Sequence, residues 1–313
     1  MKLNQYEQLV PILDQLKAAG ELEYAVDLPL APYSSFRIGG PADITVWPYS
    51  RSAMLDVVTA IRRLSIRYDV FGNGSNVLFA DEGYRGVVIF TTKMNRVVLK
   101  DGLLWADAGV SFTGLAVRAL QEGLTGLEFA YGIPGSVGGA IFMNAGAYGG
   151  EIAKICVETT VYDPHEALRG SIREVSGADQ GFDYRASAFQ TMAGAVILSG
   201  KFKLRSGDPA KIKAEMDDLM SRRREKQPLE YPSAGSTFKR APGYFTAQLI
   251  HEAGLKGLTV GGAQVSEKHA GFVINRGGAT AKDVLTLIEQ IKERIWKHYG
   301  VMIECEVRLI SAE

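Results

Sequence analysis

Cysteine, histidine and long apolar runs are scarce in this chain of 313 residues. The two cysteines and four histidines are scattered, so the sequence offers neither a disulfide framework nor a cysteine- or histidine-based metal site. No run reaches the roughly 20 apolar residues of a membrane-spanning helix. Residues 1–20 predict an amphipathic helix rather than a signal peptide. We therefore expect no metal, no membrane association and a cytoplasmic location.

An excess of charge of either sign is also absent. Lys plus Arg and Asp plus Glu number 35 each, and the sequence pI is near 6.9, which argues against a nucleic-acid-binding surface. The usual nucleotide fingerprints are missing too. There is no GxGxxG followed about 20 residues later by an acidic side chain, and no GxxxxGK[ST]. A Rossmann site and a Walker site are both disfavoured.

Glycine, by contrast, is concentrated in residues 131–150, which hold seven glycines and almost no charge. Such a segment loses much conformational entropy on ordering, so its main chain is expected to lie close to a bulky partner. A second glycine loop occupies residues 71–76, and backbone N–H groups in such loops bind pyrophosphate oxygens. Tight turns in a sheet would explain either loop alone. Together they favour a phosphate-bearing cofactor.

The pattern of apolar residues predicts a mixed α+β protein. Predicted helices cover residues 50–67, 111–122, 209–227, 245–253 and 280–299, and predicted strands cover 68–71, 86–91, 103–108, 156–162, 195–204, 270–275 and 303–310. The helix at 280–299 has the clearest signals, because Thr280 and Asp283 resemble a capping box and Gly300 ends it. Its buried stripe is expected to be Val284, Leu287, Ile288, Ile291 and Ile295.

Three further places could carry chemistry. Arg185 follows Tyr184, and its guanidinium suits a substrate carboxylate, although local sequence alone favours a surface arginine stacked on an aromatic ring. Ser236 lies in a segment of small residues, where proton donation or an N-cap are open alternatives because no GxSxG elbow surrounds it. In the last predicted strand, alternation places Glu304, Glu306 and Arg308 on one face, either in solvent or at a site, with residues 303, 305, 307 and 309 on the other.

Six motifs in order give the chain a close resemblance to the UDP-N-acetylenolpyruvoylglucosamine reductase family. They are residues 37–42 (RIGGPA), 72–76 (GNGSN), 132–148 (GIPGSVGG with NAGAY), 184–185 (YR), 234–239 (AGSTFK) and 261–266 (GGAQVS). The resemblance implies a two-part FAD-binding fold of the vanillyl-alcohol oxidase type and a C-terminal α+β substrate-binding domain. The implied parts are a helical segment at 1–32, FAD-binding subdomains at 33–92 and 93–207, and the substrate domain at 208–313.

The family's cofactor is noncovalent FAD, and neither glycine loop holds a histidine or cysteine placed for a covalent link. The motif match assigns cofactor binding to Arg37, Gly72, Asn73, Gly74, Ser75, Asn76, Gly132, Pro134, Gly135, Ser136, Gly138, Gly139, Asn144, Ala145 and Gly146. It assigns substrate binding to Tyr184, Lys239 and Gln264. Lys226 lies outside the motifs, in a basic cluster at the end of a predicted helix, and is our hypothesis for the contact to the UDP phosphates. No metal and no obligate protein partner are implied.

The resemblance also implies a reaction. NADPH reduces the flavin, and the enolpyruvyl ether of UDP-N-acetylglucosamine then takes hydride from flavin N5 at C3, which gives UDP-N-acetylmuramate for peptidoglycan. Arg185 and Glu306 are expected at the substrate carboxylate, and Ser236 at C2 as proton donor. Only a short stretch separates Arg185 from Ser236, so the chain resembles the shorter class that lacks an extra tyrosine-bearing loop. Two alternatives are another flavin oxidase of the vanillyl-alcohol oxidase type and a noncatalytic nucleotide-sugar-binding module.

Overall fold

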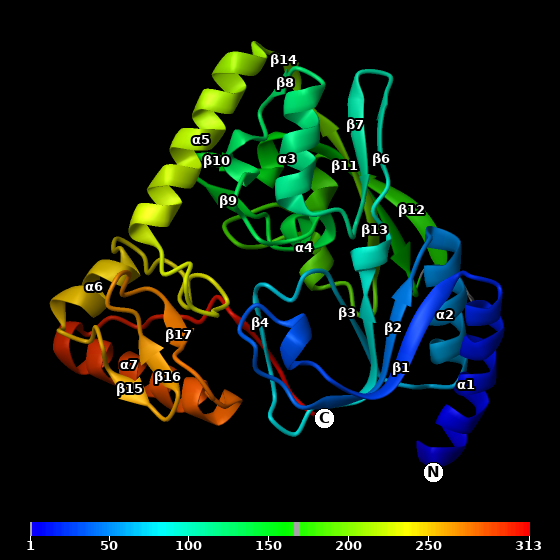
Figure 1. Ribbon diagram of the computed structural model, residues 1–313, viewed down its shortest axis with the longest axis horizontal. Helices are drawn as coiled ribbons and strands as arrows, with labels where there is room; N and C mark the ends of the chain where they lie inside the picture. The colour runs from blue at the N-terminus through cyan, green and yellow to red at the C-terminus, as the bar shows by residue number, and fades with distance from the viewer. Residues whose placement is uncertain (1, 166–169) are drawn as a thin grey trace. The chain divides into compact units, whose positions relative to one another are not determined.

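The structure is a computed structural model that describes residues 2–165 and 170–313 (Figure 1). The chain divides into two compact units, each assembled from three separate stretches. Unit 1 comprises Met1–Val26, Asp43–Asn73 and Gly86–Met220, and unit 2 comprises Asp27–Ala42, Gly74–Arg85 and Ser221–Glu313. Within each unit, stretches that are distant in sequence therefore pack together.

A five-stranded sheet in the order β12-β11-β13-β7-β6 forms one half of unit 1, with every neighbouring pair antiparallel. Its strands are β6 (Val97–Lys100), β7 (Leu103–Asp107), β11 (Cys156–Asp163), β12 (Ser171–Ser176) and β13 (Val196–Lys203). Helix α4 (Val137–Phe142) packs on strands β7 and β13 of this sheet. Helix α3 (Phe112–Gln121) contacts α4 and joins the same core through Leu115 and Ala116. The start of α5 (Pro209–Lys226) joins the same core through Ile212 and Met216.

A second sheet in unit 1 has the strand order β1-β2-β5-β3, and its β3 and β5 are parallel. The strands are β1 (Leu22–Pro29), β2 (Pro41–Pro48), β3 (Tyr68–Phe71) and β5 (Tyr84–Phe90). Two helices, α1 (Lys2–Ala18) and α2 (Arg51–Arg63), supply apolar side chains to its core, among them Leu9, Leu13, Val57 and Ile61. Two-stranded pairs complete the unit: β8 (Leu124–Thr125) with β14 (Arg205–Ser206), and β9 (Gly146–Ala147) with β10 (Gly150–Glu151).

Unit 2 is built around α7 (Ala281–Tyr299) and α6 (Thr246–Glu252), beside a sheet in the order β15-β16-β17. These strands are β15 (Thr259–Val260), β16 (Ala263–Val265) and β17 (Val273–Asn275). A further parallel pair joins β4 (Val77–Phe79) to β18 (Arg308–Ile310). Phe36, Ile38 and Leu78 lie in the same core as α7, so the early stretches of this unit are part of its hydrophobic interior.

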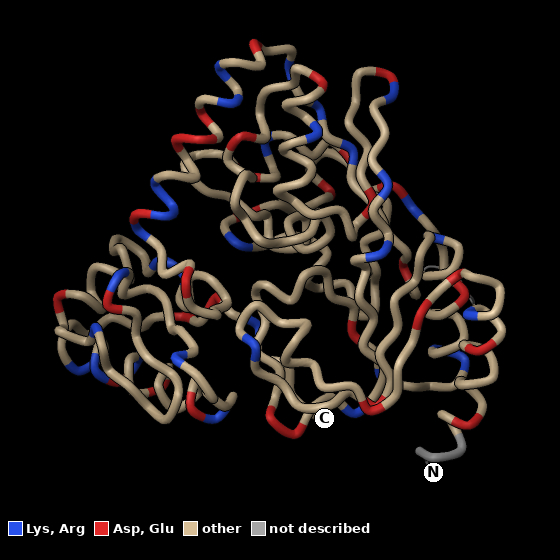
Figure 2. Tube along the Cα trace, viewed as in Figure 1, with Lys and Arg blue, Asp and Glu red and all other residues tan. Residues whose placement is uncertain are grey.

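Short 3-10 turns connect several elements of both units. They cover Ala31–Tyr33, Thr91–Lys93, Glu128–Ala130, Ile152–Lys154, Gly177–Gln180 and Ala188–Gln190. Positive and negative side chains are interspersed along α5 (Figure 2), as expected of a solvated helix in a chain without net charge. Within the described residues, no helix is both long and apolar enough to span a bilayer.

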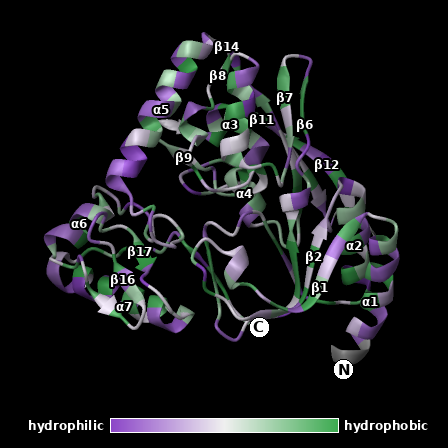
Figure 3. Ribbon diagram, in the orientation of Figure 1, coloured by the Kyte–Doolittle hydropathy of each residue, from purple (hydrophilic) through white to green (hydrophobic). Residues whose placement is uncertain are grey.

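The long C-terminal helix was predicted correctly in its bounds, caps and buried stripe. The Thr280 hydroxyl accepts from the Asp283 N–H at 3.0 Å, and the Asp283 carboxylate accepts from the Thr280 N–H at 3.0 Å, which closes a capping box. Gly300 ends the helix in the left-handed conformation at φ 64°. All five predicted stripe residues are buried, and Figure 3 shows hydrophobic and hydrophilic residues sharing this helix.

Three predicted elements are wrong in extent. The strand at 270–275 is regular only at Val273–Asn275, because the chain turns at residues 270–271. The helix at 50–67 ends at Arg63, because Ser65 adopts a left-handed φ of 52° and the chain turns there. The last predicted strand, 303–310, is regular only at Arg308–Ile310, preceded by an isolated bridge at Cys305 and a bend at Val307. The bend breaks the alternation, so Leu309 is 51% exposed whereas Ile310 is buried.

The capping box of α7 has a testable dependence on pH. Hydrogen bonding from the Thr280 N–H lowers the pKa of Asp283 below its usual value of 3.8. A carboxylate with a lowered pKa in the folded state stabilises above the unfolded pKa and loses its effect as pH falls through the folded one. We expect Asp283→Ala to cost about 1 kcal/mol near neutral pH, and less at a pH acidic enough to protonate the carboxylate in the folded state, which lies below its usual pKa of 3.8.

Thermal unfolding at both pH values measures this difference. Asp56→Ala, at an exposed position of α2, is the control and is expected to change the midpoint little. An equal loss for Asp283→Ala at both pH values would contradict a role for the charged carboxylate.

Candidate functional site

The two glycine loops meet within unit 1. A Cβ on Gly72 would overlap the Ser136 hydroxyl and lie only 2.7 Å from the Ser136 Cβ. The neighbouring Asn73 side chain donates from Nδ2 to the carbonyl oxygens of Pro134 at 3.0 Å and Gly135 at 3.1 Å. Gly72 therefore permits the close contact, and Asn73 holds the second loop by its backbone.

Segment 108–113 supports the second loop from the other side. The Val137 and Gly138 N–H groups donate to the carbonyls of Val110 and Ala108, each at 2.8 Å, and the Phe112 N–H donates to the Gly135 carbonyl at 2.9 Å. A Cβ on Gly138 would lie 2.9 Å from that of Ala108. Packing thus gives Gly138 a structural reason to be glycine, whether or not it also contacts a cofactor.

The loop backbone keeps hydrogen-bond donors available. Among the described residues, no protein acceptor pairs with the amide N–H groups of Gly72, Asn73, Gly135 or Ser136. Uncharged loops with unpaired amides and no room for side chains suit phosphate oxygens, which accept hydrogen bonds from backbone N–H groups. These residues fit the diphosphate of FAD.

The NAGAY motif positions the loop that carries Arg185, also in unit 1. Asn144 is buried in a left-handed conformation, and its side chain donates to the Asp183 carbonyl at 3.0 Å and accepts from the Ala153 N–H at 2.9 Å. Asp183 and Ala186 exchange backbone hydrogen bonds, so Tyr184 and Arg185 form the tip of a tight turn. Two predicted site motifs therefore lie together.

Arg185 itself is half-buried and adopts a left-handed φ of 55°. Its Nη1 donates to the Gly146 carbonyl at 3.3 Å, and its guanidinium carbon lies 5.3 Å from the centre of the Tyr184 ring. The stacked arrangement that the sequence left open is thus present.

Ser236 and Glu306 lie in unit 2 on two segments joined by backbone hydrogen bonds. The Glu306 N–H donates to the Thr237 carbonyl at 2.8 Å, and the Lys239 N–H donates to the Glu304 carbonyl at 2.9 Å. This pairing brings both predicted residues onto adjacent segments. No helix begins at Ser236, since the next one, α6, starts at Thr246, so the alternative of an N-cap is excluded.

The two glutamates of the last segment differ in environment. Glu304 forms an ion pair with Lys239 at 3.1 Å, and its side chain is 75% exposed. Glu306 is half-buried, and its carbonyl accepts from Asn76 Nδ2 at 3.2 Å. Asn76 also accepts the Arg308 N–H on its carbonyl at 3.0 Å, so this residue of the first glycine motif fixes the segment around Glu306.

The remaining predicted residues are spread over unit 2. Gly74 packs against the Tyr33 carbonyl, and Arg37 adopts a left-handed φ of 55°. Gln264 donates to Thr259 Oγ1 at 3.0 Å within its own hairpin, and Lys226 is exposed at the end of α5. The Gln264 side chain therefore stabilises its own hairpin, whereas no contact among the described residues fixes the exposed Lys226 side chain.

Other groups that can carry chemistry are held in their neutral forms. Burial raises the pKa of the Cys156 thiol to about 11 and also raises the pKa of Cys305, so neither favours a thiolate at neutral pH. Burial likewise lowers the pKa of His269. No group of three or more His, Cys, Asp or Glu in the described part of the chain could hold a metal ion.

Comparisons with known proteins now identify the family. A sequence profile described as UDP-N-acetylenolpyruvoylglucosamine reductase, C-terminal domain, matches residues 227–310, and one described as an FAD-binding domain matches residues 42–169. The reductase of Clostridium novyi (strain NT) is 49% identical over 281 residues, 90% of each chain. That of Clostridium perfringens (strain SM101 / Type A) is 42% identical over 311 residues, 99% of this chain and 100% of the relative.

The chain belongs to the UDP-N-acetylenolpyruvoylglucosamine reductase family. The crystal structure of the family member from Thermus caldophilus is similar, with a TM-score of 0.77 and 33% identity, and the match covers 92% of this chain and 98% of that one. Membership and the FAD-binding domain confirm the predicted fold and cofactor, and the protein is an FAD-dependent oxidoreductase.

Contact between the glycine loops should control retention of FAD. Gly72→Ala places a methyl group against Ser136, so we expect flavin affinity to fall about tenfold or more, the consequence of ~1–3 kcal/mol of overpacking. Flavin absorbance per protein, measured after release by denaturation, reports the loss. The added change Ser136→Gly removes the overlapped atoms and should restore part of the flavin.

Gly114→Ala in α3 is the matched control, because its Cβ would meet only Ser111, at an ordinary 3.4 Å. Full flavin content in Gly72→Ala, or no recovery in the double variant despite a folded protein, would contradict this account of the loops.

Proposed function

We propose that this protein catalyses the NADPH-dependent, FAD-mediated reduction of UDP-N-acetylglucosamine enolpyruvate to UDP-N-acetylmuramate in bacterial peptidoglycan synthesis. The observation that carries the proposal is the backbone pairing of the segments that hold Ser236 and Glu306. It joins a serine and a half-buried carboxyl within one unit of a protein that belongs to a reductase family. A cytoplasmic location follows from the same proposal, since the reaction uses soluble nucleotide substrates.

Ser236 is the proposed proton donor to C2 of the enolpyruvyl group. Among the described residues, no protein group hydrogen-bonds its hydroxyl, so the hydroxyl is available to a substrate. Serine is a weak acid at neutral pH, and the proton moves only if the hydroxyl is well placed and the charge it leaves is relieved. Lys239, three residues further on, is proposed to contribute that positive charge.

Arg185 and Glu306 are the proposed partners of the substrate carboxylate. FAD, when bound, supplies the hydride chemistry that links NADPH oxidation to reduction at C3. Addition at C3 leaves negative charge at C2 that spreads into the carboxylate, and donors directed at that charge lower the barrier. A guanidinium suits this task because two of its N–H groups match the two carboxylate oxygens.

The UDP-sugar contacts are proposed at Tyr184, Lys226, Lys239 and Gln264. Tyr184 is 46% exposed, so its ring is accessible to a ligand. Lys226 extends from the C-terminal end of α5, where a flexible ammonium can follow a phosphate. Gln264 is held in place by its own hairpin, where its Nε2 donates to Thr259 Oγ1 at 3.0 Å.

The role of Ser236 predicts a separation of the two half-reactions. Ser236→Ala should leave flavin reduction by NADPH nearly unchanged and slow reoxidation by the enolpyruvyl substrate about 100-fold or more, as expected for loss of a general acid. Anaerobic stopped-flow absorbance measures both steps. Ser233→Ala, a half-buried serine of the same segment whose backbone bonds to Ser35, is the control. Equal slowing of both steps would assign Ser236 a flavin contact or a structural role.

A second prediction distinguishes the two glutamates. Glu306→Gln should slow substrate reduction about tenfold or more and leave flavin reduction by NADPH nearly intact, because it changes a group proposed to stabilise developing charge. Glu304→Gln should be mild, since Glu304 is exposed and bound to Lys239. Rates of the isolated half-reactions give the ranking, and the opposite ranking would remove Glu306 from the proposed site.

A further inference from the structure

Thr237 lies between the proposed proton donor and the segment that carries the proposed carboxyl partner, and it is 1% exposed. We propose that Thr237 is a positioning residue whose buried hydroxyl sets the placement of the Ser236 hydroxyl and the Glu306 side chain. This inference rests on the proposed function, because it assumes that Ser236 and Glu306 act on the substrate.

Three hydrogen bonds connect Thr237 to two different segments of unit 2. Its N–H donates to the Gly271 carbonyl at 2.8 Å, and its carbonyl accepts from the Glu306 N–H at 2.8 Å. Its Oγ1 accepts from the Val273 N–H at 2.9 Å. Two of these bonds belong to the backbone and would survive any substitution. The bond from Val273 depends on the side chain alone.

The hydrogen bond from the Val273 N–H to Thr237 Oγ1 takes the place of a backbone hydrogen bond where the pairing between the two segments is irregular. Ser233 pairs with Ile274 in an isolated bridge, and Thr237 pairs with Gly271, so the intervening chain does not follow a regular ladder. Gly235 adopts a left-handed φ of 76°, and a Cβ there would meet nothing within 4 Å. Ser236 thus sits on a turn that projects from the pairing, and the Thr237 hydroxyl ties the end of that turn to β17.

Burial makes the hydroxyl hard to replace. Val273 is 1% exposed, so removing Oγ1 leaves its N–H without an acceptor and without access to water. The segment then shifts to recover a partner, because an unpaired buried donor is costly. A shift at Thr237 moves its neighbour Ser236 directly and moves Glu306 through the bond to the Thr237 carbonyl.

Thr237→Val keeps the shape of the side chain and removes only the acceptor. We expect the substrate half-reaction to slow about tenfold or more, the kinetic equivalent of losing one hydrogen bond at a site, with flavin reduction by NADPH changed less than about twofold. The loss should fall mainly on kcat rather than KM, since ground-state binding is not the step affected. Thr237→Ser keeps Oγ1 and should stay within about threefold of the unmodified protein, because both oxygen and donor remain paired.

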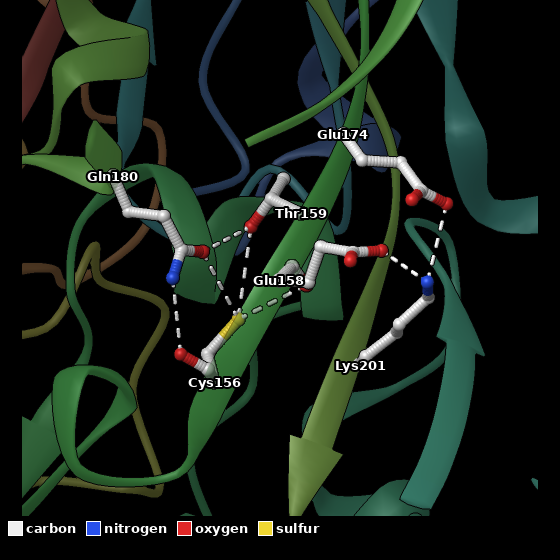
Figure 4. Close-up of polar contacts among 6 residues, drawn as sticks. All are labelled: Cys156, Glu158, Thr159, Glu174, Gln180 and Lys201. Atoms are coloured by element: carbon white, nitrogen blue, oxygen red, sulfur yellow. Dashed lines mark hydrogen bonds and ion pairs between the residues drawn. The ribbon is translucent and has the colours of Figure 1, made fainter. Parts of the chain in front are cut away.

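A buried threonine in unit 1 provides the matched control. Thr159 is fully buried, and its Oγ1 donates to Gln180 Oε1 at 2.7 Å in a polar cluster with Cys156 (Figure 4). Thr159→Val also removes a buried hydroxyl from a hydrogen bond. If the valine substitutions act only by lowering stability, both variants should be affected alike. If Thr237 is a positioning residue, only Thr237→Val should slow the substrate half-reaction and leave flavin reduction by NADPH nearly unchanged.

The double variant Ser236→Ala/Thr237→Val tests whether Thr237 acts through its neighbour. If it does, the valine should slow the substrate step much less in the Ser236→Ala background than in the native one, since coupled residues are not additive. Equal additional slowing in both backgrounds would overturn the inference. So would a folded Thr237→Val protein with an unchanged substrate step, while Ser236→Ala still fails. If Ser236→Ala itself reduces the substrate normally, the proposed role of Ser236 as proton donor fails and this inference fails with it. The proposed function fails only if the unmodified protein does not reduce the substrate.

Discussion

Close contact between the Gly72 backbone and the Ser136 side chain is the constraint on which the cofactor region depends. Gly72 directly follows β3, and Ser136 precedes α4, where its hydroxyl accepts from the Gly139 N–H at 3.2 Å. The sheet that contains β3, the second glycine loop and segment 108–113 are thereby fixed at one point. Backbone N–H groups of both loops remain unpaired there, because the hydrogen bonds between the loops run from the Asn73 side chain to the carbonyls of Pro134 and Gly135.

Unit 2 depends in a comparable way on chain segments that are distant in sequence. Asp81 accepts from the Ala281 N–H at 2.7 Å and the Lys282 N–H at 3.1 Å, so a residue of an early stretch caps the helix that forms the core. β4 pairs in parallel with β18, and the preceding Asn76 holds the segment after Glu306. The position of Glu306 is therefore determined by residues more than 200 positions earlier, as well as by Thr237.

Local signals account for the parts of this structure that sequence reasoning predicted well. The bounds of α7 followed from a capping box, an apolar period and a terminal glycine, all of which act within one helix. Long-range contacts account for the rest. Alternation placed Glu304 and Glu306 on one face, but it could not show that Lys239 pairs with the first while Asn76 binds the backbone of the second. Strands β1 and β2 were missed, and Thr237 gave no signal because its three partners lie 34, 36 and 69 residues away.

The central claim is that one flavin accepts reducing equivalents from NADPH and passes them to an enolpyruvyl UDP-sugar. The most direct measurement is an anaerobic absorbance titration of the unmodified holoenzyme, first with NADPH and then with UDP-N-acetylglucosamine enolpyruvate. The account predicts bleaching of the flavin by NADPH, recovery of the oxidised spectrum with one equivalent of substrate, and UDP-N-acetylmuramate as product. A reduced flavin that persists until oxygen is admitted, or a spectrum that NADPH does not change, would contradict it.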